Sequence, residues 1–263
     1  MAVVLVPFHL DEHLPELGDA LPAGIDVVTV LSVLPEAGEW ERYGALHEAV
    51  AHAVHDQALA SGAGTGEPVV VVSGDCAVSL GTVAGIQRAG VDVGVVWLDA
   101  HGDVHTVESS TSGYPGGMPL RILSGHRPVR YPAPAGLTFV AEERLVLVDA
   151  RDLDPAEHDY LASSRVRRVG VTELDAGHLP AGPLVLHIDL DVVDSAEIAA
   201  LRYPVTPGPS SAEVLAAARR VMATGRVVVL DLAATWNPTG GATPAAGAAL
   251  LVALLGLVRG RAS

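Results

Sequence analysis

The chain has a single cysteine, Cys76, among its 263 residues. One thiol cannot form an internal disulfide, so the fold must depend on its core, and 49% apolar residues are ample for that. The first eight residues, MAVVLVPF, lack the basic start and the cleavage site of a secretory signal peptide. We therefore expect a cytoplasmic protein.

Basic residues are also scarce, with 16 Lys and Arg against 31 Asp and Glu, which gives a formal net charge of −15. A surface that binds nucleic acid needs concentrated positive charge, so this composition argues against such a partner. No apolar run is long enough to cross a bilayer, although residues 245–258 are rich enough in Ala and Leu for a buried helix. We expect neither nucleic acid nor a membrane as partner, and a function carried by acidic groups.

Short Val-rich runs alternate with segments of helical periodicity along the whole chain. The expected strands are Val3–Val6, Val27–Val30, Val69–Val72, Val93–Leu98, Leu145–Val148, Leu184–Ile188 and Val227–Leu230. The expected helices are Glu41–Ala60, Ala77–Gln87, Pro155–Ser163, Ser211–Ala223 and Ala245–Val258.

This alternation predicts an α/β fold of three layers, α/β/α, with a mostly parallel sheet covered by helices on both faces. No linker, repeat or low-complexity tract divides the sequence, so residues 1–263 are expected to form one domain. In such folds, functional groups gather at the carboxyl ends of the strands.

Acidic residues collect at two of these strand ends. VGVVWLDAHGD runs into Asp99, His101 and Asp103, and VLHIDLDVVD runs into Asp189 and Asp191. Spacing of two places ligands on one face of an extended backbone. Four adjacent carboxylates are unfavourable unless protons or cations neutralise them, and oxygen ligands with one imidazole favour Mn²⁺ over Zn²⁺. Either cluster alone could consist of turn residues, helix caps and a structural histidine, but the two together favour a pair of divalent cations.

These segments resemble the ureohydrolase family, the arginases and agmatinases, which hydrolyse guanidino groups with paired manganese ions. The similarity runs from about residue 69 to 238, and its ligand motifs match Ser-Gly-Asp-Cys at 73–76, Asp-Ala-His-Gly-Asp at 99–103 and Asp-Leu-Asp at 189–191. It implies two Mn²⁺ ions per chain, held by Cys76, Asp99, His101, Asp103, Asp189 and Asp191. Cys76 stands where the family has histidine. A thiolate can coordinate a cation, although a buried cysteine can also be an inert apolar residue.

Two further segments resemble the arginase branch of this family. In ARDLDPAEH at 150–158, the resemblance implies that Asp154 and Glu157 bind the α-amino group of an amino-acid substrate, although Asp154 could also cap the helix that follows. The loop VHTVESSTSGYPGG at 104–117 resembles the loop that contacts the substrate α-carboxylate. It implies that His105, Ser110 and Ser112 are contact residues.

Two departures from the arginase pattern bear on the substrate. Gly116 replaces the histidine that protonates the departing amine, and losing a positioned general acid costs roughly 10²–10⁴ in rate. The glutamate that pairs with the guanidinium is also missing, because DLAATWNP offers only Ala234 or Thr235 there. An N-hydroxyguanidine is less basic than the guanidine of arginine, and its carbon is more open to attack. The pattern resembles family members that hydrolyse Nω-hydroxy-L-arginine to hydroxyurea and L-ornithine in antibiotic (D-cycloserine) biosynthesis, which is the function we expect.

The resemblance implies that Asp103 accepts the proton of the attacking water, and His105 is a second candidate catalytic residue, as proton donor. The alternatives are an arginase or other ureohydrolase acting on an unmodified guanidino acid, and a catalytically silent protein that binds an amino acid or a metal. Arginase trimers use a C-terminal tail beyond the last helix, whereas this chain stops at Ser263, soon after its Ala/Leu-rich segment. A monomer is therefore expected.

Overall fold

The computed structural model describes residues 2–62, 64, 66–198, 200–235 and 245–259. At its centre is an eight-stranded sheet in the order β4-β1-β5-β10-β9-β6-β7-β8, with every neighbouring pair parallel. The strands are β1 (Ala2–Val6), β4 (Asp26–Thr29), β5 (Val69–Ser73), β6 (Gly94–Asp99), β7 (Leu145–Asp149), β8 (Arg167–Val169), β9 (Leu184–Asp189) and β10 (Val227–Ala233).

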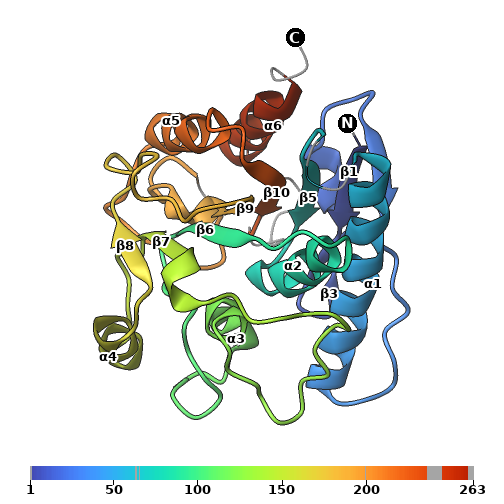
Figure 1. The fold of residues 1–263 in the computed structure, drawn as a ribbon, viewed down its shortest axis with the longest axis horizontal. Coiled ribbons are helices and arrows are strands. Elements are labelled where there is room, and N and C mark those ends of the chain that lie inside the picture. The colour runs from blue at the N-terminus through green and yellow to red at the C-terminus, as the bar shows by residue number, and fades with distance from the viewer. Residues whose placement is uncertain (1, 63, 65, 199, 236–244, 260–263) are drawn as a thin grey trace.

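Helices cover both faces of this sheet (Figure 1). One face carries α1 (Glu39–Ala60) and α2 (Ser79–Arg88), and the other carries α5 (Ser211–Met222) and α6 (Ala245–Arg259). Two shorter helices, α3 (Pro119–Leu123) and α4 (Pro155–Ser163), follow β6 and β7. None of the described helices is both long enough and apolar enough to cross a membrane.

Alternation along β5 shows how the two cores form. Val70 and Val72 belong to the apolar cluster that contains Val214 of α5, whereas Val69 and Val71 belong to the cluster that contains α1 and α2 residues. Successive side chains of a strand point to opposite faces, so a continuous valine run fills both layers at once. The three-layer fold with a mostly parallel sheet is therefore confirmed.

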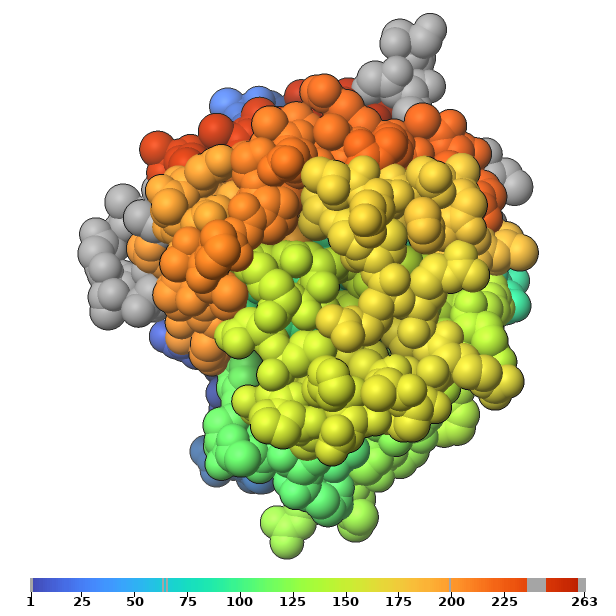
Figure 2. All heavy atoms as spheres, turned by 90° about the vertical axis from the view of Figure 1, so that its left-hand side faces the viewer, coloured from blue at the N-terminus to red at the C-terminus, as the bar shows by residue number. Residues whose placement is uncertain are grey.

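All seven expected strands are present, with ends that differ by at most three residues. Sequence patterns do not predict β8, the hairpin of β2 (Phe8–His9) and β3 (Glu12–His13), or α3. β8 is an edge strand in which both arginines are exposed, so it lacks the apolar run typical of the buried strands. Figure 2 views the molecule from the β8 side, where yellow-green to orange segments that follow α3 in the chain cover most of the surface.

The sheet order also places the acidic motifs. The strands β5, β10, β9 and β6 are consecutive neighbours, and all four run in the same direction. Their carboxyl ends therefore open at one edge of the sheet, where the segments that contain Cys76, Asp99, Asp189 and Thr235 begin.

Candidate metal centre and substrate pocket

A cavity of about 450 Å³ lies at this edge of the sheet. All the site residues predicted from the sequence line it: Cys76, Asp99, His101, Asp103, His105, Ser110, Ser112, Asp154, Glu157, Asp189 and Asp191. Six more lining residues complete its wall: Tyr114, Gly116, Gly117, Asp152, Tyr203 and Thr235.

The first group of candidate ligands surrounds His101. Asp99 is the last residue of β6, and its Oδ1 accepts a hydrogen bond from the His101 backbone N–H at 2.7 Å. The His101 Nδ1 atom lies 3.3 Å from Asp99 Oδ1 and 3.3 Å from Asp191 Oδ2. One imidazole and two carboxylates thus converge within a space suited to a single cation.

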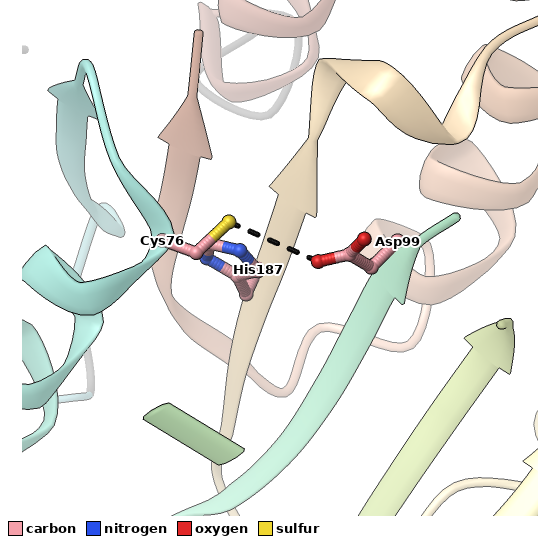
Figure 3. Close-up of side chains that lie close together, drawn as sticks. All are labelled: Cys76, Asp99 and His187. Carbon is pink, nitrogen blue, oxygen red and sulfur yellow. Dashed lines mark hydrogen bonds between the residues drawn. The ribbon is translucent and has the colours of Figure 1, made fainter. Parts of the chain in front are cut away.

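The second group surrounds Cys76, the first residue of a short 3₁₀ turn, Cys76–Val78. Asp75 fixes the start of this turn, because its Oδ1 accepts a hydrogen bond from the Ala77 N–H at 2.7 Å. The thiol donates to Asp189 Oδ2 at 2.7 Å and lies 3.8 Å from Asp99 Oδ2. Figure 3 shows the thiol directed at the Asp99 carboxylate, with His187 of β9 close by.

The expectation that the ligands project from extended backbone is wrong. The spacing of two predicts an extended backbone, yet β6 ends at Asp99 and Asp103 has a left-handed backbone with φ of 53°. Likewise β9 ends at Asp189, and Asp191 lies in a 3₁₀ turn, Leu190–Val192. Tight turns just after each strand bring the ligands together, because they fold the chain back over the sheet edge.

Burial and mutual repulsion dominate the electrostatics of these carboxyls. Burial, with the charge of Asp99 next, raises the pKa of Asp189 to about 6 and that of Asp103 well above its ordinary range. Burial and Asp189 do the same for Asp191 and for the Cys76 thiol. Without a cation, protons therefore offset part of the negative charge.

His101 provides the one strong positive charge in the cluster. Burial works against its charged form, but hydrogen bonds to Asp191 and Asp99 raise its pKa to about 12. Burial opposes ionisation of Asp99 as well, yet the bond from His101 lowers the pKa of that carboxyl. Asp99 thus keeps its negative charge beside the His101 imidazolium when no metal is bound.

This donor set fits a pair of divalent cations. It offers four buried carboxyls, an imidazole and a thiol, and Asp103 Oδ2 is a buried atom with no hydrogen-bond partner among the described residues. A buried carboxyl oxygen without a partner is costly, and a cation would supply the missing interaction.

The amino-acid end of the pocket is built around His105. Its Nε2 atom lies 3.0 Å from Asp154 Oδ2, and its Nδ1 atom lies 3.1 Å from the Ser109 hydroxyl. Glu157 accepts the backbone N–H groups of Val104 at 3.2 Å and Asp154 at 3.1 Å. Asp154 is also the N-cap residue directly before α4, so the expected helix-cap position is confirmed, and this position does not prevent contact with the pocket.

Three residues to which the sequence assigned no role at the metal centre lie against the ligands: Thr235 of the cavity wall, and the fully buried Trp97 and His187. The Thr235 hydroxyl donates to Asp189 Oδ1 at 2.8 Å, and Trp97 Nε1 donates to Asp99 Oδ2 at 3.1 Å. His187 precedes Asp189 by two positions on β9 and reaches the same cluster. The period of two that identified Asp189 could also have identified His187, because both project from one face of the strand.

Tyr114 is another residue that the sequence did not single out. A Cβ atom at Gly116 would lie 2.2 Å from Tyr114 Cζ, so the tyrosine ring fills the space beside this glycine. Its hydroxyl donates to Asp75 Oδ2 at 2.9 Å, and His9 Nδ1 lies 3.1 Å from the same oxygen. Burial and the charge of Asp75 raise the pKa of Tyr114, so the phenol keeps its proton.

Comparison with known proteins gives consistent results. A model of the arginase family matches residues 33–256. Arginase from Eremothecium gossypii is 30% identical over 202 residues, covering 69% of this chain and 49% of that protein. Human arginase-1 is 29% identical over 195 residues, covering 66% of this chain and 60% of that protein. The chain thus spans half to three fifths of the length of these relatives.

Solved structures share the fold. Arginase from Bacillus caldovelox superposes with a TM-score of 0.82 at 23% identity, covering 98% of this chain and 97% of that one. Formimidoylglutamase from Bacillus subtilis gives a TM-score of 0.72 at 16% identity, covering 99% of this chain and 86% of that one. Identities this low establish similarity of fold alone. The arginase-family model, however, matches most of the length of this chain. The chain therefore belongs to the arginase family.

Proposed function

We propose that this protein hydrolyses Nω-hydroxy-L-arginine to hydroxyurea and L-ornithine, as a step of antibiotic (D-cycloserine) biosynthesis. The observation that carries the proposal is the pairing of an acidic amino-acid pocket with Gly116, whose neighbouring space is filled by Tyr114. The pocket keeps groups that suit an α-amino acid, but it has no side chain at the position where arginases carry a proton-shuttling histidine.

The amino-acid end supports a substrate with an α-ammonium group. Asp154 and Glu157 face the cavity beside His105, and the carboxyl oxygens of both lie within 4 Å of its Nε2 atom. Acceptors in this arrangement can bind an ammonium group in a fixed orientation. The hydroxyls of Ser110 and Ser112, 3.3 Å apart in the adjoining loop, would bind the α-carboxylate.

At the opposite end, Cys76, Asp99, His101, Asp103, Asp189 and Asp191 would hold two divalent cations, with Mn²⁺ favoured where carboxylate oxygens dominate. When bound, the cations would supply Lewis acidity, which acidifies water and stabilises developing negative charge. Asp103 would also accept the proton of the attacking water, as the resemblance to the family implies. Thr235 would keep Asp189 oriented through their hydrogen bond.

The groups near the reacting carbon favour a neutral guanidine. Ala234 and Thr235 stand where arginases have a glutamate, and neither can pair with a guanidinium. A less basic guanidine does not need an ion pair with a glutamate. Its carbon is also attacked by water with less assistance from the protein. The hydroxyguanidine of Nω-hydroxy-L-arginine meets both conditions.

Steady-state turnover with Mn²⁺ added tests the proposal, with Nω-hydroxy-L-arginine and L-arginine assayed side by side. We expect hydroxyurea and ornithine from the first, and kcat/KM for the second lower by about 10² or more, as the missing general acid predicts. Urea from L-arginine at an equal rate would instead favour an arginase. No product from either substrate, together with no bound metal, would favour a silent binding protein. Asp103→Asn serves as the inactive control.

The monomeric state and the cytoplasmic location expected from the sequence remain predictions. Gel filtration with light scattering tests the first, and a trimer mass would contradict it.

A further inference from the structure

His187 is a buried histidine that the proposed reaction does not use. It lies on β9 with no exposed surface, and its ring stacks on Trp97 with centroids 3.7 Å apart. Its Nδ1 atom lies 2.9 Å from the Ser79 hydroxyl and 3.0 Å from Asp231 Oδ2. The ring is therefore held both by stacking and by two polar contacts.

These contacts determine which nitrogen carries the proton. The Ser79 hydroxyl donates its own proton to Asp231 Oδ2 at 2.6 Å, so its oxygen can only accept from His187. Asp231 is buried as well, and its other oxygen accepts from Thr82. Both neighbours of Nδ1 are acceptors, so Nδ1 bears the hydrogen and Nε2 presents a lone pair.

Among the described residues, the Nε2 lone pair has no hydrogen-bond donor. Nε2 is buried and makes no hydrogen bond to any residue the structure describes. One ligand atom each from His187, Cys76 and Asp99 lie within 4.8 Å of one another (Figure 3). A histidine that gives one N–H to a buried carboxylate and keeps the other nitrogen free is the usual arrangement at metal sites, where the carboxylate orients the ring.

We propose that His187 Nε2 is a metal ligand, which joins Cys76 and Asp99 around one cation of the centre. The inference rests on the two-cation site of the proposed function and adds a ligand to one half of it. The imidazole absent from position 76 would thus be supplied by β9.

The added ligand changes which ion this half prefers. A set of thiolate, imidazole and carboxylate suits Zn²⁺ or Co²⁺, whereas the half around His101 and Asp191 offers mainly oxygen atoms and suits Mn²⁺. The two halves of the centre would therefore select different metals, and the complete protein would hold one thiophilic cation beside one Mn²⁺.

Cadmium binding to the metal-free protein provides a test that does not depend on activity. Cd²⁺ bound to a thiolate absorbs in the ultraviolet, so titration of that band gives the affinity of the Cys76 half. We expect His187→Gln to weaken it about 100-fold and Asp231→Asn about 10-fold to 100-fold, as changes around metal ligands do. His47→Gln is the matched control, because His47 is also buried with Nδ1 bonded to a hydroxyl, that of Tyr131 at 2.7 Å, but lies outside the cluster.

The unaltered protein gives an independent answer if a variant fails to fold. In this experiment the protein is labelled with ¹⁵N-histidine and loaded with ¹¹³Cd²⁺ in both halves of the centre. In its NMR spectra we expect cadmium–nitrogen coupling at two histidines, His101 and His187. Coupling at His101 alone would overturn the inference while leaving the two-cation centre intact. The same would follow if a folded His187→Gln variant bound Cd²⁺ at the Cys76 half with unchanged affinity. Failure of Cd²⁺ and Mn²⁺ to bind at all would overturn the proposed function too.

Discussion

The ring of Tyr114 occupies the space in which a side chain at position 116 would begin. A Cβ atom on Gly116 would lie 2.2 Å from Tyr114 Cζ and 2.3 Å from its hydroxyl oxygen. The tyrosine is in turn held by its hydrogen bond to Asp75. A histidine at position 116, where the sequence comparison leads us to expect the arginase proton donor, would therefore require the Tyr114 ring to move.

Restoring that histidine alone should not produce an arginase. Gly116→His must displace the Tyr114 ring, so we expect a loss of about 1–3 kcal/mol in unfolding free energy and no gain in L-arginine hydrolysis. Urea unfolding and urea release measure the two effects. Gly117→Ala is the control, since its Cβ would meet only His105 Cδ2 at 3.8 Å. A Gly116→His variant as stable as the parent would contradict the described packing.

The stability of the metal-free protein should depend on pH through Asp189. Its folded pKa of about 6 lies above the ordinary carboxyl value near ~4, so folding favours the protonated form. The unfolding free energy should then fall as pH rises from about 4 to about 6, by roughly 2–3 kcal/mol at about 1.4 kcal/mol per unit. The raised pKa values of Asp103 and Asp191 extend this loss to higher pH.

Urea unfolding with a chelator present, between pH 4 and pH 8, measures that slope. Asp189→Asn should reduce it, and Asp159→Asn, at an exposed position on α4, should not. Added Mn²⁺ should stabilise more at pH 8 than at pH 5, because protons compete with the cation for the same oxygens. A metal-free protein that gains stability over this range would contradict the account.

His105→Asn separates the two roles expected for this residue. Both ring nitrogens already have partners, Asp154 and Ser109, which indicates that the ring positions the amino-acid end of the pocket. We expect KM for Nω-hydroxy-L-arginine to rise about 10-fold with kcat nearly unchanged. His158→Asn, an exposed change on α4, should alter neither. A large fall in kcat with constant KM would instead identify His105 as the proton donor.

Thr235→Val should weaken cation binding without a large change in volume. It removes the hydroxyl that donates to Asp189 Oδ1, and we expect affinity for Mn²⁺ to fall about 10-fold. Competition with a chromophoric chelator measures this, and Thr235→Ser, which keeps the hydroxyl, should bind nearly as the parent does. Equal affinities for the Val and Ser variants would show that the hydrogen bond does not orient the carboxylate.

The sequence predicts the sheet well because valine runs such as 69–72 leave no other way to bury both faces. It also places the candidate ligands at the right strand ends. It does not predict how they converge, because the left-handed backbone of Asp103 has no glycine to mark it. Nor does it reveal that Tyr114 fills the space at Gly116, since that depends on how the loop folds over Asp75.

The most direct test of the account is anomalous diffraction from crystals of the protein soaked with Mn²⁺ and Zn²⁺, recorded at the absorption edges of both metals. We predict two neighbouring peaks in the cavity, a manganese peak among Asp99, His101 and Asp191 and a zinc peak beside Cys76. A cavity without peaks, or peaks confined to the outer surface, would contradict the claim that these buried acids and the thiol exist to hold cations.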